Sequence, residues 1–131
     1  MRILNISAQK PDSTGSGTYL AALVRSQLAA GCEPAVLCGA APGDTQGDIP
    51  AGVPVYTVDF DTPELPFHIC GMSDVMPYPS TRYRDLTPQM ASAFEDAFCR
   101  SIERAVAEFE PDVLLCHHLY LVCALARELV R

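Results

Sequence analysis

The stretch RILNISAQKPDSTGSGTYLAALVRSQLAAG, residues 2–31, decides the fold that the sequence predicts. Residues 3–7 form a short apolar run that is typical of a buried strand. From residue 16 or 17 to residue 30, apolar side chains recur at helical spacing, and Gly31 is a suitable stop for the helix. The apolar positions of this helix are Leu20, Leu23, Val24 and Leu28.

The rest of the chain continues the alternation of strands and helices. Residues 35–38 and 53–58 are predicted strands. Residues 59–86 contain several prolines and no sustained period, but their aromatic and apolar side chains predict an ordered loop packed on the domain. Residues 113–116 are predicted to form a fourth strand and residues 118–131 a last helix.

A long amphipathic helix is predicted between the loop and the fourth strand. Thr87 is a suitable N-cap, Pro88 suits the first helical position, and Pro111 ends the pattern. Two i,i+4 ion pairs are expected on its polar face, Asp96–Arg100 and Arg104–Glu108. Its expected core stripe is Met90, Phe94, Ala97, Phe98, Ile102, Ala105 and Phe109.

This alternation predicts an α/β fold, with a parallel sheet covered by helices on both faces. Because crossovers between parallel strands are right-handed, the expected order is 3-2-1-4, the start of a Rossmann-like doubly wound sheet. The connections reverse direction between strands 1 and 4, and ligands bind outside the carboxyl ends of strands at such a switch point. We expect two distant segments to meet there, the glycine loop Thr14-Gly15-Ser16-Gly17 and the run Cys116-His117-His118.

Composition limits the class of protein. The 131 residues correspond to one domain, and 49% of them are apolar, which is enough for a buried core. The formal charge of −7 and the single lysine, Lys10, argue against nucleic acid as a partner. No apolar run approaches the roughly 20 residues of a membrane span, and the first residues lack the apolar core of a signal peptide. We therefore expect a cytoplasmic protein with no integral membrane segment.

The cysteines are expected to be buried free thiols, because none forms a Cys-x-x-Cys pair and some lie inside apolar runs. A zinc site from Cys116, His117, His118 and Cys123 matches no structural zinc spacing, so no metal is expected. The six cysteines are Cys32, Cys38, Cys70, Cys99, Cys116 and Cys123.

The local sequence leaves two interpretations of the glycine loop open. Its glycines would let a phosphate approach the backbone, where a helix N-terminus offers free N–H groups. Alternatively, Gly15 forms a turn with positive φ and Gly17 packs closely on the sheet. Two specific nucleotide motifs do not match, because Leu20 stands where a dinucleotide fingerprint needs a third glycine and Thr18 where a P-loop needs lysine.

The histidines after the fourth strand are candidates for a site. At the start of a helix the dipole disfavours an imidazolium, so His117 or His118 would stay neutral and could bind a sugar hydroxyl or a phosphate. The alternative is that the histidine only satisfies backbone groups. With the glycine loop opposite, we expect one of the two to be functional, whereas His68 lies in no motif and is expected to be incidental.

Three segments together resemble the N-terminal half of a glycosyltransferase of the GT-B fold, in particular the retaining nucleotide-sugar enzymes of glycosyltransferase family 4. They are residues 2–37, the loop GMSDVMPYPSTRYRDLTPQM and the run PDVLLCHHLYLVCALAREL. The resemblance implies two Rossmann-like domains with the active site between them, of which this one mainly receives the acceptor.

The resemblance also implies roles for particular residues. Gly15, Ser16 and Gly17 would face the phosphates and sugar of the donor, and His117 would contact the donor sugar as a catalytic residue. Leu115 replaces an earlier histidine of the family pattern. No metal or cofactor is implied beyond the nucleotide sugar. Arg82 and Arg84 would border the acceptor and could pair with an anionic group, although solvated loop charge is the simpler interpretation.

The principal nucleotide-sugar machinery of the family, including a pair of glutamates separated by seven residues, lies in a C-terminal domain. Glu95 and Glu103 have that separation, but we expect both on the solvated side of the long helix. We therefore expect residues 1–131 to be one truncated acceptor-side domain, inactive alone and lacking the donor domain. An exposed sheet edge or truncated surface could then form a dimer. A self-contained nucleotide or small-molecule binding module and a non-catalytic interaction domain are the alternatives.

Overall fold

A computed structural model describes residues 1–130. Its main sheet consists of four parallel strands, β1 (Arg2–Ile6), β2 (Glu33–Ala40), β3 (Val55–Asp59) and β6 (Val113–Cys116). Their order is β3-β2-β1-β6, so the predicted 3-2-1-4 arrangement is confirmed. The register places Ile6 of β1 beside Leu37 of β2 and Cys116 of β6.

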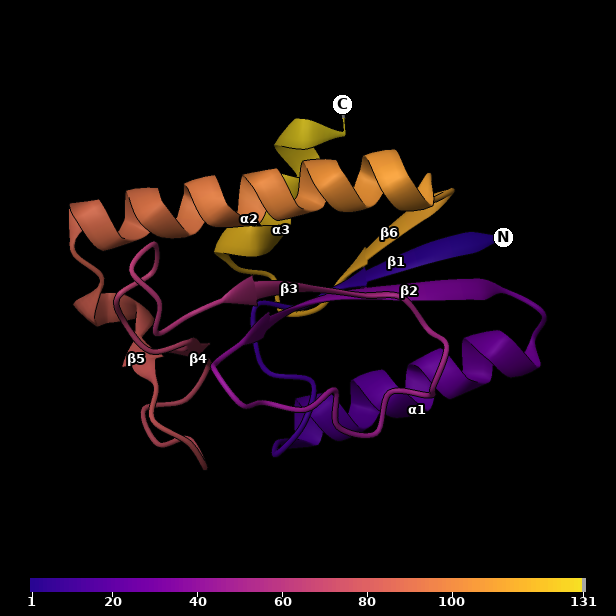
Figure 1. The fold of residues 1–131 in the computed structure, drawn as a ribbon, viewed down its shortest axis with the longest axis horizontal. Coiled ribbons are helices and arrows are strands. Elements are labelled where there is room, and N and C mark those ends of the chain that lie inside the picture. The colour runs from indigo at the N-terminus through magenta and orange to yellow at the C-terminus, as the bar shows by residue number, and fades with distance from the viewer. Residues whose placement is uncertain (131) are drawn as a thin grey trace.

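Helices cover both faces of this sheet, as the alternation of elements predicts (Figure 1). Helix α1 (Gly15–Ala29) lies on one face, whereas α2 (Pro88–Phe109) and α3 (Leu121–Leu129) lie together on the other. The arrangement is a Rossmann-like α/β fold. None of the helices within residues 1–130 combines the length and the apolar character that crossing a bilayer requires.

The predicted boundaries of α1 are nearly correct, but its buried face differs from the prediction. Leu20 and Val24 are buried, whereas Leu23 is half-buried and Leu28 is 43% exposed. Gln27 lies in the interior instead, because its carboxamide exchanges two hydrogen bonds of 2.9 and 3.0 Å with buried Asn5 of β1. An apolar count along the helix cannot identify a buried face that contains a paired amide.

Helix α2 follows its prediction closely. The Oγ1 atom of Thr87 caps it by accepting from the backbone N–H of Met90, and the helix ends at Glu110 in the left-handed conformation. The predicted stripe is buried except for Met90, which is half-buried. The Arg104–Glu108 pair is present at 3.0 Å, but Arg100 pairs with Glu64 rather than with Asp96.

Residues 59–86 are ordered and packed on the domain, as expected. Phe60, Leu65 and Ile69 are buried in the core that α2 covers. The segment also contains a short parallel pair that the sequence analysis did not predict, β4 (Cys70–Gly71) with β5 (Thr81–Arg82), followed by a single 3-10 turn, η1 (Tyr83–Asp85). Two-residue strands are too short to produce a recognisable alternation in a sequence.

The last helix begins later than predicted. His118 has a φ of 63°, which no helix accommodates, and α3 starts at Leu121 after an extended Tyr120. The turn between β6 and α3 therefore holds both histidines. It is fixed from the helix side, where the Cys123 Sγ donates to the carbonyl oxygen of His118 at 2.8 Å.

Candidate functional site

The carboxyl ends of β1 and β6 bring the two predicted segments together. The backbone N–H of His117 donates to the carbonyl oxygen of Ile6 at 2.8 Å, so His117 directly continues the pairing of the two strands. The imidazole of His117 lies against the ring of Tyr19 in the second turn of α1, with centroids 6.0 Å apart. The switch point of the sheet thus places the start of α1 beside the histidine turn, as the topology predicts.

The first turn of α1 has two free backbone donors. Thr14 is the N-cap, and its Oγ1 accepts from the N–H of Gly17 at 3.1 Å. The N–H of Thr18 donates to the Thr14 carbonyl oxygen at 3.0 Å. The N–H groups of Gly15 and Ser16 make no hydrogen bond within residues 1–130, which leaves them available at the positive end of the helix dipole.

The alternative interpretation of the glycine loop, in which Gly15 forms a turn and Gly17 packs on the sheet, is wrong for both residues. Gly15 does not have a positive φ, and a Cβ atom there would meet nothing within 4 Å. The positive φ falls on Ser13, at 60°. Gly17 does pack closely, but on the backbone of Pro11 and Asp12 rather than on the sheet, because a Cβ atom would lie 2.8 Å from the carbonyl carbon of Pro11.

Gln9 belongs to this site, although the sequence analysis did not single it out. Its side chain is buried, and its Oε1 accepts from the Ser16 hydroxyl at 2.9 Å. The hydroxyls of Thr14 and Ser16 lie 2.9 Å apart, so the three side chains form one chain of hydrogen bonds. The signal in the sequence is a polar residue between a buried strand and the glycine loop.

Unpaired polar atoms gather at this edge of the sheet. Within residues 1–130, five buried side-chain nitrogen or oxygen atoms have no hydrogen-bond partner, and three of them are Gln9 Nε2, His117 Nε2 and His118 Nδ1. A buried polar atom without a partner costs about 1–3 kcal/mol. Such a cluster is therefore expected where a ligand or water completes the hydrogen bonds.

His117 is held in its neutral form. Burial lowers the pKa of its imidazole, and the neighbouring His118 lowers it further. The sequence predicts a neutral histidine because of a helix dipole, but His117 precedes α3 by four residues and burial is the main cause of the lowered pKa. A neutral imidazole can hydrogen-bond a hydroxyl or phosphate oxygen without carrying charge.

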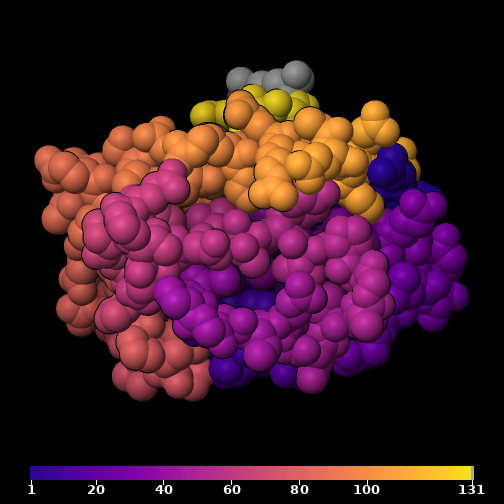
Figure 2. Space-filling view, viewed as in Figure 1, coloured from indigo at the N-terminus to yellow at the C-terminus, as the bar shows by residue number. Residues whose placement is uncertain are grey.

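The other side of the glycine loop is acidic. A hollow of ≈ 370 Å³, visible in Figure 2 with the indigo N-terminal segment at its floor, is lined by Pro11, Cys38, Asp44 and Asp59 among others. Burial, followed by nearby carboxylates, raises the pKa of Cys38 to about 12, so this thiol stays protonated. Lys10 is engaged there with Asp44 at 2.7 Å. An anion is therefore favoured on the α1 and β6 side of the loop, not here.

Arg82 and Arg84 lie close to the histidine turn, but both are already paired. Arg82 contacts Asp85 and Arg84 contacts Asp74, each at 2.5 Å. Both arginines line a cavity of ≈ 210 Å³ together with Tyr120. The cavity joins the long loop to the β6–α3 turn, and the ring of Tyr83 packs on that of Tyr120 at 4.4 Å.

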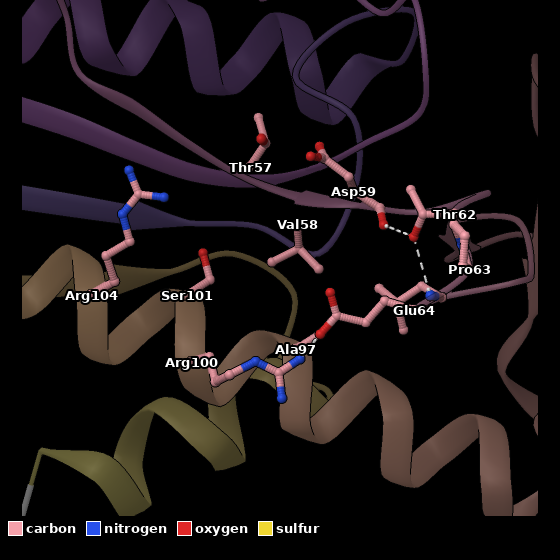
Figure 3. A pocket seen from close by; sticks show the side chains of 11 residues that line it. Thr57, Val58, Asp59, Thr62, Pro63, Glu64, Ala97, Arg100, Ser101 and Arg104 are labelled. Carbon is pink, nitrogen blue, oxygen red and sulfur yellow. Dashed lines mark hydrogen bonds and ion pairs between the residues drawn. The ribbon is translucent and has the colours of Figure 1, made fainter.

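A larger cavity, of ≈ 500 Å³, lies away from the switch point, between the β3 edge and α2 (Figure 3). Both of its arginines are already paired, Arg100 with Glu64 in the lining and Arg104 with Glu108 outside it. Asp59 also lines the cavity. No motif in the sequence predicts this cavity, and none of the candidate site residues lines it.

The remaining sequence candidates lie apart from the switch point or on the surface. His68 contacts Asp61 at 2.7 Å in the long loop, and Glu95 and Glu103 are exposed on α2. All six cysteines are free thiols, as predicted, but only Cys38 and Cys70 are buried and the other four are half-buried. Within residues 1–130, no three His, Cys, Asp or Glu side chains are grouped so that they could hold a metal ion.

Neither a protein-family model nor a curated protein sequence matches the chain.

Proposed function

We propose that this domain is the acceptor-side part of a GT-B glycosyltransferase, which moves a sugar from a nucleotide-sugar donor to an acceptor with retention. The observation that carries the proposal is the contact between Tyr19 of α1 and His117 after β6. It joins two free backbone donors and a neutral imidazole at one edge of the sheet. This is the order of motifs on which the resemblance to glycosyltransferase family 4 rests.

The geometry supports a separate role for each part of the site. Transfer of the sugar builds negative charge on the leaving diphosphate, and the N–H groups of Gly15 and Ser16 at the α1 N-terminus would offset that charge. His117 would orient the sugar through a hydrogen bond, which its neutral form allows. Gly17 would contribute by shape, because its N–H is already engaged by Thr14. The acceptor would enter beside Arg82 and Arg84, and no metal takes part.

Gly15→Asp tests the proposal in the protein encoded by the complete reading frame. Position 15 has open space, and an acidic side chain in the first turn favours the helix, so the fold should be retained. The carboxylate would repel a diphosphate, and we expect kcat/KM to fall about 100-fold, the loss typical of one oxyanion donor. Gly15→Ala is the matched control and should stay within about threefold of the unsubstituted protein.

The measurement is release of nucleoside diphosphate from a panel of nucleotide sugars in the presence of candidate acceptors. His117→Ala should also lower kcat/KM for the sugar donor that is used. Unchanged turnover in both Gly15→Asp and His117→Ala would refute the assignment of the site. We further expect the 131-residue chain to transfer no sugar alone, and detectable transfer by it would contradict that expectation.

A self-contained nucleotide-binding module is the second candidate. The observation that favours it is that two free backbone N–H groups and three unpaired buried side-chain atoms lie at one edge of the sheet, namely Gln9 Nε2, His117 Nε2 and His118 Nδ1. Saturable binding of a nucleotide to the isolated chain, with no sugar transfer by the complete protein, would favour this module over the transferase.

A further inference from the structure

The carboxamide of Gln9 is a buried donor group with nothing to bind. Its side chain is only 2% exposed, and its Nε2 has no hydrogen-bond partner. It lies at the first turn of α1, because its Oε1 is 2.9 Å from the hydroxyl of Ser16. This site therefore combines a helix N-terminus with an independent, unpaired and buried polar side chain.

The hydrogen bonds around Gln9 define which of its ends is free. The Ser16 hydroxyl has one hydrogen, which it donates to Gln9 Oε1. The hydroxyl of Thr14 is then the donor in its contact with Ser16, while its oxygen accepts from the N–H of Gly17. The positive end of α1 favours the same orientation, because it attracts the carboxamide oxygen and not the amino group.

The orientation decides the chemistry of the ligand. Three unpaired groups at the first turn are donors, namely the N–H groups of Gly15 and Ser16 and the Nε2 of Gln9. A ligand that satisfies them must present several acceptor oxygens close together, as a phosphate does. Lys10, the cationic side chain next to Gln9 in sequence, is held by Asp44, so the three neutral donors would make the contacts at the first turn.

We infer that Gln9 is a ligand-binding residue that donates from Nε2 to a phosphate oxygen of the bound molecule, with Thr14 and Ser16 as the residues that position it. The inference rests on the proposed function in taking the ligand to be a phosphate compound. Nε2 is buried in the ligand-free chain, so binding requires the Gln9 carboxamide to become accessible to the ligand. Gln9 thereby distinguishes an oxyanion from a ligand that offers donors.

NMR titration of the ¹⁵N-labelled 131-residue chain with inorganic pyrophosphate tests this inference. We expect the side-chain NH₂ resonances of Gln9 and the backbone amides of Gly15 and Ser16 to move along one binding isotherm. The NH₂ resonances of Gln89, which is exposed on α2, are the internal control and should stay in place. Those of Gln27 should also stay, because Asn5 already binds that carboxamide.

Gln9→Met is the matched variant, since it keeps the length of the side chain and removes the donor. Loss of a hydrogen bond to a charged ligand should weaken pyrophosphate binding about 10-fold or more. Gln89→Met should bind as the unsubstituted chain does. In urea unfolding without ligand, Gln9→Met should change the free energy of unfolding only slightly. It loses the hydrogen bond from the Ser16 hydroxyl but also removes the unpaired Nε2 donor.

The outcomes separate this inference from the proposed function. If the Gly15 and Ser16 amides respond while Gln9 does not, and Gln9→Met binds equally well, the role of Gln9 is refuted and the loop assignment survives. If the Gln9 resonances respond but the complete protein transfers no sugar, the phosphate site is supported and the proposed transferase function is refuted. Absence of any response at high millimolar pyrophosphate would overturn the inference. Even if Gln9→Met does not fold, the titration of the unsubstituted chain shows whether Gln9 responds to the ligand.

Discussion

The rings of Tyr19 and His117 pack edge to face, with centroids 6.0 Å apart and planes inclined by 71°. The two residues are 98 positions apart in sequence. Tyr19 belongs to the helix that follows β1, and His117 belongs to the turn that follows β6. This contact fixes the distance between the first turns of α1 and the turn after β6, which are the two walls of the candidate site within this chain.

Tyr19→Ala should make the imidazole of His117 more basic. Tyr19 covers one side of that ring, and burial is the main cause of its lowered pKa, so uncovering it should move the pKa back toward the ordinary value. The loss of stability should be about 1 kcal/mol or less, as for a single partly exposed aromatic pair. An NMR pH titration of His117 measures the effect, with the exposed neighbour Thr18→Ala as control. An unchanged titration midpoint in Tyr19→Ala would contradict the burial argument.

Alanine at the two glycines of the loop should have opposite effects. At position 17 the added Cβ meets the backbone of Pro11 and Asp12, which cannot move aside as a flexible side chain can. Gly17→Ala should therefore lower the free energy of unfolding by about 1–3 kcal/mol. Gly15→Ala adds a methyl group in open space at a helical position and should be neutral or stabilising by up to about 1 kcal/mol. Urea unfolding of the two variants measures the difference. Equal effects at both positions would show that a Cβ atom at position 17 is not opposed by the backbone of Pro11 and Asp12.

His117 should make the domain less stable in mild acid. Its pKa is lowered in the folded chain, so the unfolded chain binds a proton first as the pH falls below about 6.5. Stability from this residue is fully present above that pH and is lost as the pH falls through the lower, folded pKa, with a slope no steeper than about 1.4 kcal/mol per pH unit.

His117→Gln removes this titration and should flatten the corresponding part of the profile. Urea unfolding between pH 7.5 and mild acid, done in parallel on both proteins, measures the difference. His68→Gln, in the long loop, is the matched control. If the profiles of His117→Gln and the unsubstituted chain coincide, burial of His117 does not contribute to acid stability.

The amide pair of Asn5 and Gln27 should show strong coupling. Asn5→Ala would leave both polar ends of the Gln27 carboxamide without their Asn5 partner, at a cost of about 3 kcal/mol. The double substitution Asn5→Leu with Gln27→Leu should recover most of that loss, because it leaves neither carboxamide unpaired and removes only the weaker hydrogen bond from Asn5 to the Ala35 carbonyl oxygen, at 3.2 Å. A double-mutant cycle in urea should give a coupling of about 1–3 kcal/mol, and additive effects would mean that the pair is not formed.

Most of the fold can be predicted from the sequence, because the spacing of apolar residues along the chain identifies most helices and strands. The spacing of apolar residues from Phe94 to Phe109 identifies α2, and the run at residues 113–116 coincides with β6. The strand order follows from the handedness of crossovers and needs no tertiary information. It is this order that places His117 beside α1.

The parts that could not be predicted depend on contacts between distant residues. Arg100 could reach Asp96 one turn away, but its partner is Glu64 from the long loop, which no helical spacing reveals. The start of α3 depends on the left-handed backbone of His118, at a residue with no glycine to signal it. Gln9 was missed for the same reason, since its role arises only when Ser16 folds back against it.

The pairing of Gln27 with Asn5 also limits how related chains can change in length. Gln27 and Ser16 are about 16 Å apart along α1, and each added residue turns the helix by about 100°. An insertion or deletion between them would turn either the buried amide or the first turn away from its place on the sheet. Length variation among relatives is therefore expected in the connection 41–52, whereas the interval from Ser16 to Gln27 should keep a constant number of residues.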